Sequence, residues 1–326
     1  MDSGDATGLD GAMDQPRRGF LKGATASLVA ASLPHREGRA EKAEEMIDIH
    51  QHVNFHARQN SQLIEHQRIM GVTKSVLLPS GSQLARKSTD LGRSNGLAAR
   101  VFGSGAAERL AAKFPGEFVW FANEVPDIEN TTKELEHWLE RGACGIGEQK
   151  FALECDSKAM RRLYDVARDY EVPVLLHFQH GRYNLGFERF HKILEAYPTV
   201  NFFGHAQTWW GNIDAKHQQK EMYPKGPVTA GGLTDRYLAD YPNMFGDLSA
   251  GSGLNAMTRD KEFTAGFFDR HQDKLCFGSD CADTVGDGEK CSGSRMRDTV
   301  RELAPNDEAR AKIFSGNAKR LIKGLT

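Results

Sequence analysis

The sequence predicts a mixed α/β fold in which eight parallel strands, each followed by a helix, close into a (β/α)8 barrel. Short apolar runs alternate with amphipathic segments from residue 46 to the C-terminus, which is typical of βαβ units around a parallel sheet. Eight such units in about 250 residues are what a TIM barrel requires. No GxGxxG motif follows the first run, so nothing indicates the dinucleotide-binding form of an open, doubly wound sheet.

The expected elements follow directly from this alternation. The strands are the apolar runs at residues 46–52, 75–79, 118–123, 145–151, 172–178, 200–206, 244–249 and 274–280. The helices include the amphipathic segments at residues 62–70, 106–113, 131–141, 158–170, 187–197 and 264–271. The glycine-rich stretch "GSGAAERL", which starts at Gly103, lacks a third glycine and is interpreted as a loop that enters a helix.

Composition and charge limit the function classes. The chain has 326 residues, 39% of them hydrophobic and 26% charged, and a formal net charge of -2. A near-neutral charge argues against a nucleic-acid surface, which needs clustered Lys and Arg. Apart from the N-terminus, no apolar run approaches the ~20 residues of a membrane-spanning helix. We therefore expect a small-molecule partner and no membrane contact in the mature form, and homo-oligomerisation stays open.

The cysteines do not predict a stabilising framework. Their number is odd and no CxxC pair occurs, so neither a disulfide framework nor a zinc ribbon is indicated. We expect buried or free thiols at Cys144, Cys155, Cys276, Cys281 and Cys291.

The N-terminal segment is predicted to be an export signal. In "QPRRGFLKGATASLVAASLP", Arg17 and Arg18 precede Phe20, Leu21 and Lys22, and a short apolar stretch follows at residues 24–33. The order resembles a twin-arginine signal, with Pro16 where Ser or Thr is usual; a basic, disordered tail is the alternative. The resemblance implies export of the folded protein to the periplasm by the twin-arginine machinery, often with a cofactor already inserted. We accordingly divide the chain into a signal and linker at residues 1–45 and a barrel domain at residues 46–326.

Several predicted strands end in residue types that bind metal ions. These are His50 and His52 on the first strand, Glu148 and Lys150 on the fourth, His177 on the fifth, His205 on the sixth and Asp280 on the eighth. Side chains two apart on a strand share a face, and barrels carry their active sites at the carboxyl ends of the strands. Each residue alone has an ordinary explanation, such as an ion pair or a helix cap. Because buried imidazoles and carboxylates need partners, the joint pattern favours a divalent metal site.

This set of motifs resembles the amidohydrolase superfamily. The order His-x-His, Glu, His, His, Asp is more narrowly similar to the amidohydrolase-related family, which also contains decarboxylases of the aminocarboxymuconate-semialdehyde type and some lactonases. The closing "IFSGNAKRLI", residues 313–322, is similar to the last helix of that family. The resemblance extends from Met46 to the C-terminus, and it indicates a superfamily rather than a substrate.

The resemblance implies a ligand set. His50, His52 and Asp280 would bind one ion, with His177 as a further ligand in one-metal members. In two-metal members His177 and His205 would hold the second ion, and Glu148 would bridge the two. Zinc is the default ion, with manganese open, and one ion is favoured over two, which stay possible because Glu148 could bridge them. Lys150 could bear a carbamate bridge or could position a substrate carboxylate.

The resemblance also implies a reaction. The ion would make hydroxide available at neutral pH, and Asp280 would accept the proton of the water and pass it to the leaving group. The ion or a protonated His205 would polarise a substrate carbonyl. Attack would cleave an amide, an ester or a lactone, which makes the protein a metal-dependent hydrolase. A decarboxylase on the same scaffold and an exported, non-catalytic ligand-binding barrel are the alternatives.

Three further residues are candidates for substrate binding at the rim of the barrel. Arg182 could hold a carboxylate, or it could be an ordinary surface arginine. Trp209 and Trp210 directly follow the sixth strand and could wall a pocket, or they could pack in the core. Residues 211–233 show no strand pattern, and a loop of that length in a compact barrel is typical of a lid.

Overall fold

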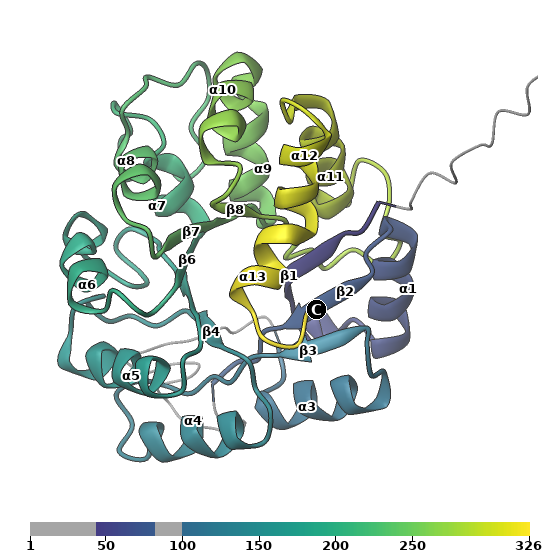
Figure 1. Cartoon of the computed structure of the whole chain (residues 1–326), viewed down its shortest axis with the longest axis vertical. Helices are drawn as coiled ribbons and strands as arrows, with labels where there is room; N and C mark the ends of the chain where they lie inside the picture. Colours follow the sequence, from purple (N-terminus) through teal and green to yellow (C-terminus); the bar gives the residue numbers. More distant parts are fainter. Residues whose placement is uncertain (1–43, 82–99) are drawn as a thin grey trace, which may run out of the picture. The chain divides into compact units, whose positions relative to one another are not determined.

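Eight parallel strands form a ring that is surrounded by helices (Figure 1). The structure is a computed structural model that describes residues 44–81 and 100–326. The strands are β1 (Ile47–Gln51), β2 (Lys74–Leu77), β3 (Phe118–Trp120), β4 (Ile146–Gln149), β5 (Val174–His177), β6 (Phe202–His205), β7 (Met244–Asp247) and β8 (Leu275–Cys276). Each falls within, or within one residue of, a predicted run. The predicted TIM barrel is confirmed.

The ring closes through hydrogen bonds at its two seams. Strands β1–β3 form one hydrogen-bonded set and strands β4–β8 form the other, in sequence order. Ala122, just past β3, bridges to Ile146 of β4. On the other side, the N–H of Ile49 in β1 donates to the carbonyl of Phe277, just past β8, at 3.1 Å. These contacts bring the carboxyl ends of all eight strands to one rim.

The helices alternate with the strands, as predicted. They are α1 (Asn60–Met70), α3 (Ser104–Lys113), α4 (Thr131–Glu140), α5 (Lys158–Asp169), α6 (His191–Ala196), α7 (Ala206–Gly211), α8 (Leu233–Asp240), α9 (Ala250–Thr258), α10 (Lys261–His271), α11 (Ser292–Leu303), α12 (Asp307–Ala311) and α13 (Asn317–Leu321). Capping residues set several of the helix starts: the side chains of Ser157, Asp260 and Asn306 accept hydrogen bonds from backbone N–H groups in the first turns of α5, α10 and α12. The predicted helix at 187–197 is interrupted, because a 3-10 turn at Phe187–Arg189 precedes α6.

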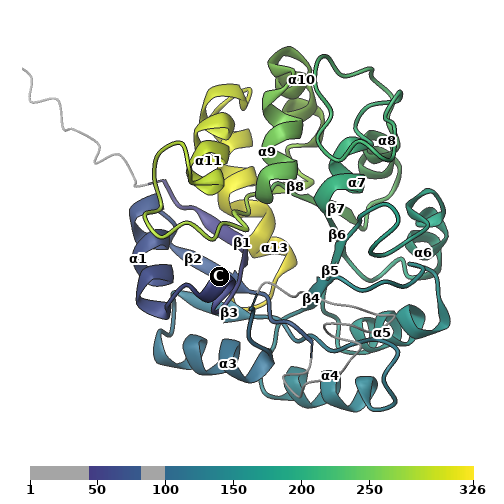
Figure 2. The same cartoon turned by 180° about the vertical axis from the view of Figure 1, so that it is seen from behind.

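Two apolar layers hold the ring. The larger layer lies between the strands and the outer helices, and it includes Trp120, Tyr164 and Phe202. The smaller layer combines strand residues such as Leu175 with Leu321 of α13 and the apolar residues that follow that helix. The last helix crosses the ring in both views (Figures 1 and 2). We infer that it closes the interior of the ring, which leaves the opposite rim for polar residues.

The two strands that carry the first candidate ligands are locally irregular. The pairing of β1 with β2 shifts register between Asp48 and Gln51, and that of β4 with β5 shifts between Ile146 and Gln149. Irregular pairing of this kind re-aims side chains near functional sites. His50 lies within the first shift and Glu148 within the second, so both side chains are delivered into the rim of the ring.

Among residues 44–81 and 100–326, no helix combines the length and the apolar character that crossing a membrane would take. The predicted export signal falls on residues 1–45, of which residues 1–43 lie outside the described part of the chain, so it stays a prediction.

Candidate metal centre

Four side-chain atoms from three places in the sequence converge at the carboxyl rim. The Nε2 atoms of His50 and His52 lie 3.2 Å apart. Glu148 Oε2 lies 3.6 Å from the first of these nitrogens and 3.5 Å from the second. Asp280 Oδ1 lies 3.8 Å and 3.3 Å from the same two nitrogens. The structure thus gathers residues of β1, β4 and the segment after β8 at the rim: His50, His52 and Asp280 form one group of possible ligands within 4.8 Å of one another, and Glu148, His177 and His205 form another.

These separations fit a shared divalent ion. Ligand atoms held tetrahedrally at about 2.0–2.2 Å from an ion lie about 3.3–3.6 Å from one another. In addition, Glu148 Oε2 and Asp280 Oδ1 are buried atoms with no hydrogen-bond partner. A buried carboxylate oxygen is costly unless a donor or a cation faces it. The donor set and the two orphaned oxygens therefore both fit a metal ion.

Hydrogen bonds turn the Nε2 atoms of the histidines toward this point. His52 Nδ1 donates to the carbonyl of Leu78 at 2.7 Å, and His50 Nδ1 donates to Asp247 Oδ2 at 2.6 Å. Because the opposite nitrogen carries the proton in each ring, both Nε2 atoms present lone pairs to the cluster. This is the arrangement that metal-binding imidazoles require.

His177 and His205 lie on the other side of Glu148. His177 Nδ1 donates to Glu148 Oε1 at 2.6 Å. His205 Nε2 lies 3.8 Å from that same oxygen and 3.6 Å from Asp280 Oδ2. The separation of 2.6 Å is that of a charge-assisted hydrogen bond and is shorter than the distance between two ligands of one ion. In this arrangement His177 orients Glu148.

Burial and neighbouring charges set the ionisation of the cluster. Burial alone would raise the pKa of Glu148, but Lys150 and the hydrogen bond from His177 outweigh it and hold that pKa well below the ordinary value. Burial likewise opposes ionisation of Asp280, yet the neighbouring imidazoles of His50 and His52 lower its pKa. Burial and the neighbouring His50 lower the pKa of His205 well below its usual range. A lowered pKa keeps His205 neutral, which does not suit the protonated electrophile considered from the sequence.

Asp280 is the member of the cluster that faces the open side. Its side chain is 15% exposed, whereas those of His50, His52 and Glu148 are at most 1% exposed. Its backbone adopts a left-handed conformation, with φ of 42°, and its N–H donates to the carbonyl of His50 at 2.9 Å. Such strained backbone persists where the surroundings over-determine it, and it often marks functional sites.

Sequence reasoning missed two residues that hold the histidines. Asp247, at the end of β7, accepts hydrogen bonds from His50 Nδ1 and, at 2.9 Å, from Ser249 Oγ. Because the hydroxyl proton of Ser249 is donated to Asp247, Ser249 Oγ accepts a hydrogen bond from His205 Nδ1 at 2.9 Å. A signal was present, because Asp247 ends a predicted strand in the same manner as His177 and His205.

Replacing Asp247 by asparagine is expected to weaken metal binding by about 10–100-fold, the usual cost of losing an orienting carboxylate. The amide keeps the size of the side chain but no longer offers a charged acceptor to His50 Nδ1. Competition with a chromophoric chelator measures the affinity. Asp273→Asn, which changes a largely exposed carboxylate, serves as the control. Wild-type affinity in Asp247→Asn would contradict this role.

Lys150 and Arg182 lie at the rim without joining the cluster. The Nζ of Lys150 stands over the ring of Tyr183, 5.6 Å from its centroid, and its charge acts on Glu148 and His177. The carbamate bridge at Lys150 stays a prediction, while Glu148 Oε2 itself lies 3.6 Å and 3.5 Å from the Nε2 atoms of His50 and His52. Arg182 lies in the turn between Gln179 and Tyr183, where its side chain is exposed. Both cations remain candidates for contact with a substrate carboxylate.

Trp209 and Trp210 do not line the rim, which corrects one of the two interpretations of the sequence. They lie on α7 with exposures of 0% and 1%. Trp209 packs against Phe187, and Trp210 packs against Phe267 and donates from its indole N–H to the carbonyl of Asp247 at 3.0 Å. Because α7 starts directly after β6, both indoles fall in the layer between the ring and the outer helices, so they serve the core.

Truncating Trp209 to alanine is therefore expected to destabilise the fold by about 3–5 kcal/mol, as large buried aromatics do. Urea unfolding followed by circular dichroism measures the change. Phe102→Ala, at an aromatic residue that is 46% exposed, should change stability far less. A decrease of less than about 1 kcal/mol in the free energy of unfolding of Trp209→Ala would contradict the assignment of Trp209 to the core.

The segment at residues 211–233 contacts residues just past β5 and β6, and its interpretation as a lid stays a prediction. Gln179, two residues after His177 on the chain, donates from Nε2 to Met222 Sδ at 3.5 Å. Gln207 Nε2 donates to the hydroxyl of Tyr223 at 3.2 Å. Met222 and Tyr223 are both 47% exposed. A separate cavity of about 490 Å³ includes Gln179 in its lining but none of the residues of the cluster.

Comparison with known proteins agrees with the fold. No family model matches the chain, and neither does any curated protein. The chain is similar to the solved structure of an uncharacterized TIM-barrel protein from Bordetella bronchiseptica, with 14% identity over 85% of this chain and 98% of that one and a TM-score of 0.57. It is also similar to an amidohydrolase II (16% identity, 85% and 99% coverage, TM-score 0.51) and to 2,6-dihydroxybenzoate decarboxylase complexed with 2,6-dihydroxybenzoate (14%, 86% and 99%, 0.51).

At such identities the likeness establishes the fold alone. The similar solved structures include a TIM-barrel protein, a putative amidohydrolase, a TatD homologue and a decarboxylase. Fold and rim together define a class: a TIM-barrel protein whose carboxyl rim carries groups of histidines and carboxylates that could hold a metal ion.

Proposed function

We propose that this protein is a metal-dependent hydrolase of small carbonyl compounds, acting on an amide, an ester or a lactone. The observation that carries the proposal is the pair of orphaned oxygens, Glu148 Oε2 and Asp280 Oδ1, which face His50 and His52 at distances suited to a shared ion. A structural ion pair would have satisfied these oxygens with donors. A bound cation satisfies these two oxygens better than a structural ion pair does.

His50, His52, Glu148 and Asp280 are the proposed ligands of one ion, with zinc as the default and manganese as the alternative. One ion is favoured over two because Glu148 Oε1 is already committed to His177. A divalent ion in this position supplies Lewis acidity and lowers the pKa of water from ~16 toward ~7. Both chemistries suit hydrolysis of a carbonyl bond.

The protein's own residues supply proton transfer and positioning. Asp280, the cluster residue on the open side, is proposed to accept the proton of the attacking water and to return it to the leaving group. Asp247 and Ser249 hold His50 and His205 in their tautomers. Lys150, at the rim, is proposed to attract a substrate carboxylate where the substrate has one.

An activity screen with metal-loaded protein tests the proposal. The protein is stripped of metal, reloaded with zinc or with manganese, and offered lactones, sugar esters, N-acyl compounds and aromatic carboxylic acids. We expect an acid together with an alcohol or amine, in a reaction that depends on the ion. Release of carbon dioxide from the carboxylic acids would instead indicate a decarboxylase. Tight ligand binding with no product of either kind would support a non-catalytic barrel.

A further inference from the structure

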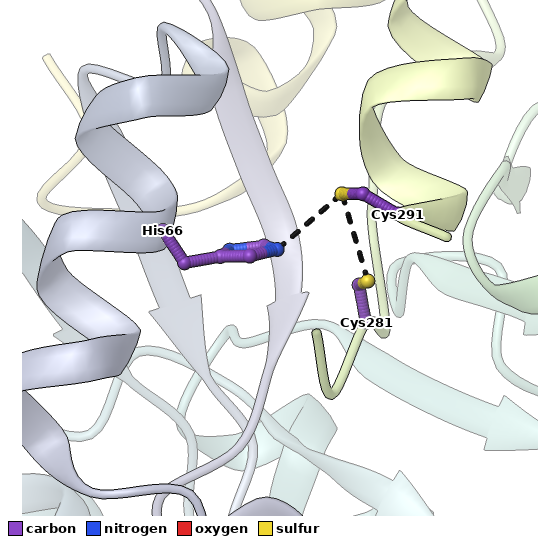
Figure 3. Close-up of side chains that lie close together, drawn as sticks. All are labelled: His66, Cys281 and Cys291. Carbon is purple, nitrogen blue, oxygen red and sulfur yellow. Dashed lines mark hydrogen bonds between the residues drawn. The ribbon is translucent and has the colours of Figure 1, made fainter. Parts of the chain in front are cut away.

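We propose a second metal site, made by His66, Cys281 and Cys291, that binds a thiophilic divalent ion such as zinc. The ion would link the loop at residues 281–291 to α1. The three side chains come from distant parts of the chain (Figure 3). His66 lies on α1, Cys281 directly follows Asp280, and Cys291 immediately precedes α11. None of the three belongs to the proposed catalytic cluster.

The separations are those of ligands on one tetrahedral ion. The two Sγ atoms lie 3.7 Å apart, and Cys291 Sγ lies 3.4 Å from His66 Nε2. With zinc–sulfur bonds of about 2.3 Å and zinc–nitrogen bonds of about 2.0–2.1 Å, tetrahedral geometry gives about 3.8 Å and about 3.5 Å for these two distances. All three ligand atoms lie within 4.8 Å of one another.

Neighbouring side chains place a lone pair of His66 toward the sulfur atoms. Gln67 Nε2 donates to Asp48 Oδ2 at 2.8 Å, which leaves Gln67 Oε1 as an acceptor. That oxygen lies 2.9 Å from His66 Nδ1 and therefore receives its proton. His66 Nε2 is then unprotonated and faces the thiols, which is the tautomer that a metal ion requires.

The three ligands lie in a closed setting, as structural metal sites do. Their exposures are 0% for His66 and Cys291 and 3% for Cys281. The loop between the two cysteines packs directly on α1: a Cβ atom at Gly286 would lie 2.2 Å from the carbonyl oxygen of His66. Because the residues already surround the point, an ion would need little rearrangement.

An ion here would brace the proposed catalytic centre. Cys281 is covalently next to Asp280, so fixing its sulfur restrains the segment that carries that carboxylate. The hydrogen bonds from His66 through Gln67 reach Asp48, which in turn accepts from the backbone N–H of His50 at 2.9 Å. The site would thus hold two ligand-bearing segments in place without contacting the substrate.

Cobalt substitution tests the site independently of catalysis. The full-length protein is reduced, stripped of metal and titrated with Co²⁺ alone. Thiolate ligation produces charge-transfer absorption in the near ultraviolet, which histidine and carboxylate ligands at the rim cannot produce. We expect this absorption to saturate at one sulfur-ligated cobalt per chain, and to vanish in Cys281→Ser and in Cys291→Ser.

Matched variants separate this proposal from the proposed function. Cys144→Ser should keep the absorption, because Cys144 is a buried thiol that contacts the carbonyl of Trp120. His52→Ala should also keep it while losing the rim ion. Should either cysteine variant fail to fold, X-ray absorption of the zinc-loaded wild-type protein gives the same answer, with sulfur expected at about 2.3 Å from zinc.

Two results would overturn the proposal. Reduced wild-type protein without the charge-transfer absorption, but with all five thiols reactive after unfolding, would show a hydrogen-bonded thiol pair. Protein isolated without reductant that shows a Cys281–Cys291 disulfide by peptide mapping, and that binds no sulfur-ligated cobalt after reduction, would show a redox pair instead.

Discussion

Replacing Asp280 by asparagine is expected to lower turnover by about two to four orders of magnitude, the usual contribution of a positioned proton acceptor. Asparagine keeps the size of the side chain and one oxygen near His52, so the ion should stay bound when metal is supplied in excess, although its affinity falls because a neutral amide is a weaker ligand than a carboxylate. The amide cannot take a proton from water. Turnover of the substrate identified by the screen, together with metal analysis of the same sample, measures both effects.

Asp287→Asn is the matched control for that experiment. Asp287 lies on the same loop, but its side chain is 61% exposed and pairs with Arg297. The Asp287→Asn substitution should therefore leave turnover unchanged. Undiminished turnover in Asp280→Asn would remove Asp280 from the chemistry, whereas loss of both metal and turnover would reduce its role to that of a ligand.

Replacing His52 by alanine is expected to weaken binding of the rim ion by more than about 100-fold, since a direct ligand costs more than an orienting residue. The variant removes the nitrogen that lies 3.5 Å from Glu148 Oε2 and 3.3 Å from Asp280 Oδ1. Turnover should fall with metal occupancy. Elemental analysis after dialysis against a weak chelator gives the metal content.

His137→Ala, on the exposed face of α4, controls for the loss of an imidazole and should retain the metal of the wild-type protein. If His52→Ala also retained the full complement, including under chelator competition, the assignment of the β1 histidines as ligands would fail.

The barrel could be predicted from the sequence because each strand is buried and is therefore a short apolar run. The ends of the strands were predicted less accurately. The predicted run at 118–123 shrinks to β3 at Phe118–Trp120, and the run at 274–280 shrinks to β8 at Leu275–Cys276. Beyond these ends the chain remains buried while it leaves the hydrogen-bonded ladder to build the rim. Apolar character does not distinguish those two states.

The geometry of the rim was readable in part. Alternation along one strand predicted that His50 and His52 share a direction, and their Nε2 atoms do lie together. The hydrogen bond between His177 and Glu148 depends on the distance between neighbouring strands, which residue types do not encode. The sequence therefore favoured one ion while two stayed open, and the hydrogen bond from His177 to Glu148 is a further reason for one.

The proposed site of His66, Cys281 and Cys291 could not be predicted from the spacing of these residues in the sequence. His66 and Cys281 are far apart along the chain, and they meet because closure of the ring brings the loop after β8 beside α1. A search for CxxC spacing finds only sites whose ligands are local. The two tryptophans were ambiguous for a related reason: whether an aromatic on α7 faces the core depends on where that helix starts after β6.

The most direct test of the central claim is an anomalous difference map from crystals of the metal-loaded protein, collected at the absorption edge of the added ion. We predict a peak at the carboxyl rim, about 2.0–2.2 Å from His50 Nε2, His52 Nε2, Glu148 Oε2 and Asp280 Oδ1. A map with no peak among these four atoms, from protein that analysis shows to contain the metal, would contradict the account.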